Sequence, residues 1–402
     1  MKPLHFPLTT FFVACLYFTG ATQGSHNFDF FGKGENSYTL QQTGYYGRMV
    51  NYSNDTRLGH SNLTTIDVDW NHWFGGGLGA GISLDGSWSG NHFTYEQLNR
   101  NWTIAPNLSY GKTLNNNWGI YARAEVLFGE TKDISKTQTN TFTDKTGLFG
   151  FGGEVAFPYR IGKYTALTTS LGYNYLKSDF KGSSNKETDN AFNLGLHLED
   201  YLQCHEMRCD PHTGFKLSAD KYDQGSGFLF GETRGQFSTG TNKFEYFNLP
   251  TTTKENFTSL DLGLHGAYYI VDYIGIGGGI DFSHMMQKQS GGSNKYSWNY
   301  IEFAPEVYIN APVNNGLRNA FLKGGGYFGS NQTKITSNNN TSTEKFSIGG
   351  FNAGVGYNAF FAEQSALQIC IYYKSETEKN KENDDKTKEK GWGISVGLAH
   401  AF

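Results

Sequence analysis

Residues 391–402 read GWGISVGLAHAF, and this stretch decides the fold. The even-numbered positions carry the larger side chains, from Trp392 through Ile394 and Val396 to Phe402. The odd-numbered positions carry only Gly, Ser and Ala. Because successive side chains of a β-strand point to opposite faces, this alternation predicts a strand with one bulky apolar face and one small, more polar face.

The same period of two recurs along the chain. It is clear in the segments Ile104–Tyr110, Ile120–Phe128, Phe192–Leu198 and Ile301–Ile309, where an apolar face alternates with a face of charged and small residues. A soluble sandwich would show the same period with its apolar face buried. The spacing of the segments favours another interpretation, since short connections such as Lys112–Asn117 alternate with long polar ones. The expected long loops are Asn51–Asn62, Gly90–Asn101, Thr131–Lys145, Ser178–Asn190, Ser238–Asn256, Gln287–Ser297, Ser330–Glu344 and Ser375–Lys390. Short turns at one end and long loops at the other are typical of a membrane-spanning barrel.

Composition agrees with this class of protein. The 402 residues include 51 Gly and 16% aromatics, and the mean hydropathy is −0.52. A spanning barrel has low hydropathy because only alternate residues face lipid. The net charge of −4 gives no basic surface for nucleic acid, so no nucleic-acid partner is expected.

The first 21 residues resemble a secretory signal peptide. Lys2 supplies the positive start, Leu8–Phe18 is mostly apolar, and Thr19–Ala21 offers small residues for cleavage. Phe12–Cys15 is a weak match to a lipoprotein box, which gives lipidation as a less favoured alternative. We therefore predict export, with residues 1–21 removed.

An internal repeat with an offset of about 200 residues divides the mature chain. Thr165-Ala166-Leu167 recurs as Ser365-Ala366-Leu367, and the Ala-Pro pair at 105–106 recurs at 304–305. The matches keep their order and nearly constant spacing. They predict a first barrel unit at 22–202, a periplasmic linker at 203–226 and a second unit at 227–402.

Each unit holds about eight expected strands, so the chain is predicted to be all-β, a transmembrane antiparallel up-and-down barrel of about sixteen strands. Closure is obligatory because an open edge would leave backbone groups unpaired in lipid. The even strand number places both termini in the periplasm. Aromatics near the segment ends are expected to form girdles at the membrane interfaces; they are Trp70, Trp73, Phe74, Trp118, Tyr268, Tyr269, Tyr357, Phe360 and Phe361.

The last strand, which ends at Phe402, resembles the assembly signal of outer-membrane barrels, although His400 stands where an aromatic residue is commoner. Each unit also resembles the small eight-stranded outer-membrane barrel domain common in Bacteroidetes-type bacteria. The Ala-Pro strands, the Gly-rich segments 77–86 and 275–284 and the closing strand 391–402 carry this resemblance. It implies residence in the outer membrane of a Gram-negative bacterium, among outer-membrane lipids and lipopolysaccharide, after insertion by the barrel-assembly machinery.

Two arrangements of sixteen strands remain open. One large barrel is wide enough for an aqueous channel, whereas two eight-stranded barrels are each filled by their own side chains. The long linker Gln203–Ser226 favours two barrels, and the rarity of tandem barrels favours one. We expect one large barrel.

Charged residues on the inner faces are the candidate functional residues. Alternation places eleven of them in the lumen: Asp67, Asp69, Asp85, Arg123, Glu125, Glu154, Asp261, Asp281, Glu302, Glu306 and Lys323. They form either an acid-rich constriction that favours cations or a structural ion-pair network that fills a closed barrel.

The linker cysteines Cys204 and Cys209 are predicted to form a disulfide in an oxidising compartment. Free thiols, or zinc held with His205 and His212, are the less favoured alternatives, and no metal site or cofactor is expected. No His pairs convincingly with Ser and Asp, so no catalytic residues and no enzyme activity are predicted. The leading functional hypothesis is a porin-like passive channel for small solutes. The alternative is a closed structural or adhesive barrel that binds an unidentified ligand through its extracellular loops.

Overall fold

A computed structural model describes residues 30–401 except 34, 41–43, 55, 94–95, 138–139, 163–164, 182–184, 204–221, 231–233, 246–251, 291, 293, 314–317, 338–339 and 361–363. In these residues the regular structure consists of eighteen β-strands with a single 3-10 position at Tyr222. Within the described part of the chain, no helix is long and apolar enough to cross a membrane.

The strands follow one another along the chain, and residues 204–226 form the longest connection between them. They are β1 (Glu35–Leu40), β2 (Gly44–Ser53), β3 (Thr56–Gly75), β4 (Leu78–His92), β5 (Glu96–Thr113), β6 (Gly119–Lys136), β7 (Thr141–Arg160), β8 (Thr165–Lys181), β9 (Lys186–Gln203), β10 (Gly227–Phe230), β11 (Arg234–Glu245), β12 (Thr252–Val271), β13 (Ile274–Gln289), β14 (Lys295–Val313), β15 (Arg318–Ser337), β16 (Asn340–Phe360), β17 (Ser365–Asn380) and β18 (Lys386–Ala401).

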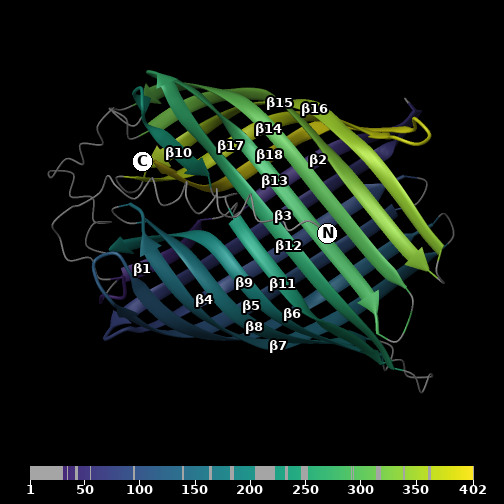
Figure 1. The fold of residues 1–402 in the computed structure, drawn as a ribbon, viewed down its shortest axis with the longest axis horizontal. Coiled ribbons are helices and arrows are strands. Elements are labelled where there is room, and N and C mark those ends of the chain that lie inside the picture. The colour runs from purple at the N-terminus through teal and green to yellow at the C-terminus, as the bar shows by residue number, and fades with distance from the viewer. Residues whose placement is uncertain are drawn as a thin grey trace.

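Sixteen of these strands form one closed antiparallel ring (Figure 1). Consecutive strands pair from β2 to β9 and from β11 to β18, β9 pairs with β11, and β18 pairs with β2. The predicted up-and-down barrel of sixteen strands is therefore confirmed. Closure gives each strand a partner on both sides, which a sheet in lipid requires.

The two short strands change the topology at one end of this ring. β1 pairs with β3 on one side and with β9 on the other, as Tyr38 lies opposite both Trp70 and Asp200. β1 and the seven strands β3–β9 thus form a ring of eight. β10 does the same in the second half, where Leu229 lies opposite both Gly266 and His400, so β10 and β12–β18 form a second ring of eight.

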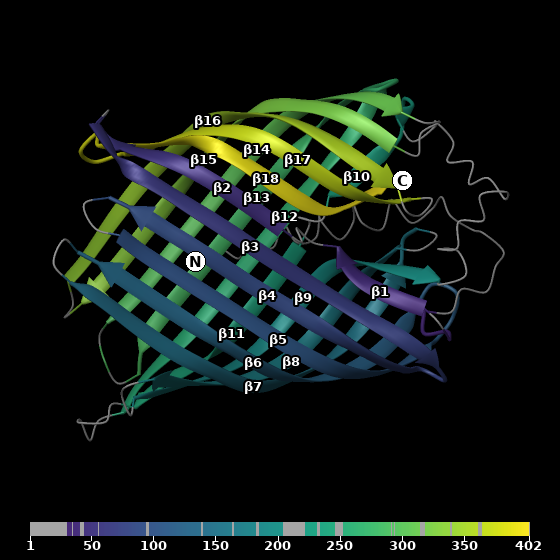
Figure 2. The same cartoon turned by 180° about the vertical axis from the view of Figure 1, so that it is seen from behind.

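The barrel consequently has two unlike ends, which we call the split end and the fused end. At the split end, which holds β1 and β10, the ribbons part into two groups (Figures 1 and 2). At the fused end β2 pairs with β18 and β9 pairs with β11, which joins the halves into the ring of sixteen. β9 shows the change of partner directly, since Leu198–Gln203 faces β1 and Lys186–His197 faces β11. Both arrangements considered from the sequence are present, one at each end.

The expected long loops at the fused end are wrong in detail. Most of Thr131–Lys145 is strand, because β6 continues to Lys136 and β7 begins at Thr141. In Ser375–Lys390, β17 continues to Asn380 and β18 begins at Lys386. In these segments both strand faces are polar, which indicates that the strands contact water there and not that they are unstructured. The hydrogen-bonded ladder between the two strands continues into the polar segment. Strands of up to 21 residues exceed the length of about 9–11 needed to cross a bilayer.

A tight turn at the split end depends on glycine. Gly75, Gly76 and Gly77 all have positive φ, at 98°, 64° and 80°, where β3 turns into β4. L-residues rarely adopt this region, so three successive glycines allow a very short connection.

Candidate functional site

The outer surface of the ring carries an apolar band. Large hydrophobic side chains on successive strands are strongly exposed, as shown by Leu108 on β5 at 66% and Leu171 on β8 at 59%. Further members are Val126, Phe151, Leu194, Leu264, Ile276, Val307, Leu322, Val355, Ile369 and Ile394. Exposed apolar surface on this scale is unfavourable in water, and it is the surface that a spanning barrel presents to lipid.

Aromatic side chains fill the first ring at the split end. Phe30 and Phe31, which precede β1, are 0% and 2% exposed and lie among Trp73, Tyr121 and Tyr201. The ring centroid of Phe31 lies 4.5 Å from that of Trp73 and 5.9 Å from that of Tyr121. Eight strands enclose a space that side chains can fill, so this cluster occupies the interior of the ring there.

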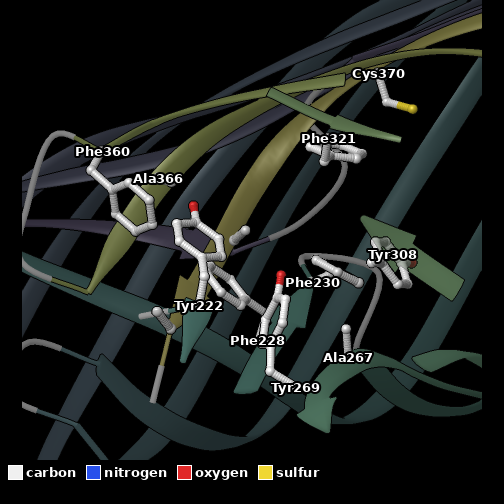
Figure 3. Close-up of a cluster of buried hydrophobic side chains, with 12 residues drawn as sticks. Tyr222, Phe228, Phe230, Ala267, Tyr269, Tyr308, Phe321, Phe360, Ala366 and Cys370 are labelled. Atoms are coloured by element: carbon white, nitrogen blue, oxygen red, sulfur yellow. The ribbon is translucent and has the colours of Figure 1, made fainter. Parts of the chain in front are cut away.

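A second aromatic cluster fills the other ring at the same end (Figure 3). Tyr222, which precedes β10, stacks on Phe228 at 5.4 Å and meets Tyr269 edge-on at 5.6 Å. Phe360 lies 6.4 Å from Tyr222, and Phe321 belongs to the same cluster. Burial raises the pKa of the Tyr222 hydroxyl well above its ordinary value, so this hydroxyl stays neutral.

Three predicted lumen residues of the first unit form one ion network. Arg123 Nη1 lies 2.7 Å from Asp69 Oδ2, and Arg123 Nε lies 3.0 Å from Glu154 Oε1. All three side chains are largely buried, at 17–18% exposed. They line a cavity of about 280 Å³ together with Glu125 and His197.

The second unit holds a corresponding but weaker charge network. Lys323 Nζ lies 3.3 Å from Glu306 Oε1, and the Asn352 amide donates to the same oxygen at 2.8 Å. The Tyr308 hydroxyl donates to the other carboxylate oxygen of Glu306. These groups line a cavity of about 200 Å³ with Glu302, and the cavity borders the second aromatic cluster at Tyr308 and Cys370.

The remaining predicted lumen residues alternate with exposed apolar ones, since Ile66, Leu262 and Ile280, next to Asp67, Asp261 and Asp281, are 37–47% exposed. Asp67 stands directly opposite Asp85 across β3 and β4. Asp281 Oδ2 lies 3.0 Å from His265 Nε2. Asp261 accepts a hydrogen bond of 3.1 Å from Ser283.

The structure therefore separates these residues into clusters instead of joining them in a single constriction. Glu302, which accepts a hydrogen bond of 2.6 Å from the Tyr300 hydroxyl, belongs to the second-unit cavity. Whether any of the eleven carries solute remains a prediction.

Several predictions fall outside the described residues, namely the signal peptide, Phe402 and the Cys204–Cys209 disulfide. Cys370 is a buried free cysteine on β17. No group of three or more metal-binding side chains occurs in the part of the chain that the structure describes.

The two rings meet at the split end through a buried polar cluster. The Thr165 hydroxyl donates to Asp200 and lies 2.7 Å from His400 Nδ1. Because the hydroxyl proton is used toward Asp200, the His400 ring donates to Thr165. All three residues are at most 2% exposed, and His400 comes from the other unit. The departure from an aromatic residue at His400 is thereby explained, since this side chain faces the first ring instead of lipid.

Sequence reasoning missed the residues that fill the split end. Trp73, Tyr269 and Phe360 were expected in interfacial girdles, but they are buried in the two clusters. Trp118, Phe74 and Tyr268 are exposed at 44–53%, as a girdle requires. The structure shows a correspondence between the units that the sequence pattern alone does not mark, because Phe30 lies five residues before the start of β1 and Tyr222 lies five residues before the start of β10.

No family model and no curated protein matches this chain. Solved structures of other barrels are similar at low identity. CdiB from Acinetobacter baumannii is 12% identical with a TM-score of 0.35, and the match covers 90% of this chain but only 60% of CdiB. The Pseudomonas putida toluene transporter TodX is 8% identical with a TM-score of 0.33, over 92% of this chain and 91% of TodX. OmpT, an outer membrane protein of Vibrio cholerae, is 12% identical with a TM-score of 0.28, over 90% and 98%. Such likeness concerns the barrel fold and no activity.

Proposed function

We propose that this protein is an outer-membrane channel for small polar solutes, wide at its fused end and gated at its split end by the two aromatic clusters. Solute enters the ring of sixteen strands and reaches two separate charged cavities. It leaves toward the periplasm only when the aromatic cluster below a cavity opens. This proposal comprises three statements: the barrel lies in the outer membrane, its split end faces the periplasm, and solute passes through it.

The observation that carries the proposal is the position of the two cavities. The smaller cavity is lined by the second unit alone, and the larger one by the first unit together with Arg234, Gly235 and Gln236 of β11; charged side chains from several strands converge on each. A ring of sixteen strands leaves room for water, whereas a ring of eight is filled by side chains. A polar cavity between a wide mouth and a filled exit is the geometry of a gated passage. Three acids, Asp69, Glu125 and Glu154, stand against two cations, Arg123 and Arg234, around the larger cavity, so cations should pass that side more readily.

Planar-bilayer conductance of the full chain tests the proposal. The unmodified protein should open rarely, and Phe30→Ala/Phe31→Ala should increase the open probability through the first ring. Tyr222→Ala/Phe228→Ala should do the same through the second ring, and the two effects should add. Trp118→Ala removes an exposed aromatic at the same end and should change nothing.

The competing function is a closed barrel that binds a surface ligand through the fused end. It is favoured by the length of the strands there, which project beyond what a bilayer requires. If all four aromatic substitutions together give a folded, heat-modifiable protein without resolved openings, the channel proposal fails and the binding function is preferred. Shortening the β17–β18 hairpin should then abolish surface binding.

A further inference from the structure

Four cations stand side by side on the outer face of the first unit, near the fused end. Arg100 lies opposite Lys132, Lys132 opposite Lys145, and Lys145 opposite Lys181, across β5, β6, β7 and β8. We call these four residues the basic row. Like charges directly opposite each other destabilise a sheet, so the row needs compensation.

The protein supplies little of that compensation. Glu130 is paired with Lys181 at 2.5 Å, and the described residues show no ion pair for Arg100, Lys132 or Lys145. Asp133 and Asp144 lie one residue along the strands from Lys132 and Lys145, and therefore on the inner face. Asp179 lies in the same outward row as Glu130 and is paired with Lys177 at 3.1 Å. These two acids against the four cations and Lys177 leave an outward charge of about +3.

The basic row lies at the border of the apolar band. Ile104, Phe128 and Phe149 form the nearest outward row that is apolar on β5, β6 and β7, and they are 38–49% exposed; on β8 the same row carries Lys177. From Phe128 to Lys132 the chain advances four residues, about 13 Å along a strand and roughly 10 Å along the barrel axis at the usual tilt. The outward face of β6 is apolar from Ile120 to Phe128, and the midpoint of this stretch, Ala124, lies eight residues from Lys132, or roughly 20 Å along the axis. If Ala124 marks the bilayer centre, Lys132 lies in the headgroup region, about 15–22 Å from that centre.

We infer that the basic row binds the phosphate groups of a phosphorylated glycolipid in the leaflet around the fused end. A phosphate carries more than one negative charge and three acceptor oxygens, so it can satisfy neighbouring cations on adjacent strands. The exposed rings of Phe128 and Phe149 offer the acyl chains a surface two outward rows below the basic row, beyond the row that contains Trp102 and Glu130. This inference rests on the outer-membrane location in the proposed function, and not on the passage of solute.

The second unit contains a row that corresponds to the basic row but has neutral residues at the positions that match Arg100 and Lys132. Asn299 lies opposite Gln332, and Gln332 opposite Lys345, in the same outward register on β14, β15 and β16. The pair Arg100→Asn/Lys132→Gln therefore introduces residues that the same fold already carries at the matching positions. Lys243→Gln/Lys334→Gln removes equal charge from the outer face at the same end and serves as the control.

The test uses full-length folded protein in a nonionic detergent, with native mass spectrometry as the readout. The probes are bisphosphorylated lipid A, the same lipid without phosphate, and inorganic phosphate. Bisphosphorylated lipid A should bind the unmodified protein and the control equally. Loss of two cations near an anionic lipid should weaken its binding to Arg100→Asn/Lys132→Gln by about thirtyfold. Asn299→Arg/Gln332→Lys should gain a second bound lipid.

Three results would overturn the inference. They are equal binding by Arg100→Asn/Lys132→Gln, equal binding of the dephosphorylated lipid, and displacement of lipid A by inorganic phosphate at low millimolar concentration. The last result would identify a site for free anions. Heat-modifiable migration shows that each variant is folded. Conductance of the same samples is measured independently of lipid binding. Loss of the lipid-binding inference therefore leaves the channel proposal standing, and absence of conductance leaves the lipid-binding inference standing.

Discussion

A pair of engineered cysteines distinguishes the fused end from two independent barrels. In an antiparallel ladder without bulges, the sequence numbers of the two residues in each pair always add up to the same value. For β10 and β18 this sum is 629, from Leu229 and His400. If β11 continued along β18 in that register, Thr239 would face Lys390. In the structure Thr239 instead faces Phe192 of the other unit.

The backbone alone does not select between these pairings. The cross-unit ladders involve twelve residue pairs between β9 and β11 and ten between β2 and β18, and re-pairing within each unit would restore nearly as many. Charges favour the observed register, since Glu245 faces Lys186. The alternative would place Glu245 opposite Asp384 and Lys243 opposite Lys386. Cross-strand charge pairs contribute about 0.2–1 kcal/mol each, so the fused end is favoured by roughly 1–3 kcal/mol, or about five- to 150-fold.

The assay replaces Cys204, Cys209 and Cys370 by Ser and adds a protease site to the linker. Thr239→Cys/Phe192→Cys should cross-link, because directly opposed residues have the Cα separation that a disulfide requires. After cleavage the two halves should stay joined without reductant. Thr239→Cys/Lys390→Cys should leave the halves separate and mostly reduced. Efficient cross-linking of the second pair, with none of the first, would refute the fused ring and leave two independent barrels.

Three further predictions concern stability and assembly. Arg123→Gln leaves two largely buried carboxylates without their cation and should lower the free energy of unfolding by about 3–5 kcal/mol. Lys243→Gln, at an exposed pair, is the control and should lower it by less than about 1 kcal/mol. Denaturant titration in detergent measures both values. Thr165→Val removes the hydroxyl that His400 contacts and should cost about 1–3 kcal/mol in the same titration; no change would mean that this cluster does not hold the rings together. Deletion of Phe402 should slow insertion and leave protein in the periplasm, and unchanged outer-membrane levels on fractionation would contradict its role as an assembly signal.

The barrel itself was predictable because alternation acts locally. Ile394 and Trp392 face outward and are exposed at 41% and 63%, while Gly391 and Gly393 face inward, as the period of two requires. The same rule placed Arg123 and Glu154 on inner faces of neighbouring strands. Their contact also depends on register, which alternation does not supply, so the network with Asp69 was not predicted.

The split end was not predictable in this way, because it depends on which partner a strand chooses. Nothing in the local pattern of β9 indicates that Leu198–Gln203 pairs with β1 while Lys186–His197 pairs with β11. Burial of Trp73 was missed for the same reason. An aromatic residue near a strand end suits the membrane interface unless a ring of eight closes around it, and that ring exists only through β1.

In the proposed function, topology and gating are one problem. A uniform ring of sixteen strands would be too wide for Phe31, Trp73 and their neighbours to fill, and the barrel would be an open pore. Two uniform rings of eight would have no shared wide mouth, and each interior would be closed along its length. The exchange of partners by β9 and β18 supplies a wide polar mouth and two narrow exits within one set of strands. Because β1 and β10 create those exits and the residues that precede them fill the exits, movement of either short strand would open its own ring and leave the sixteen-strand ring intact.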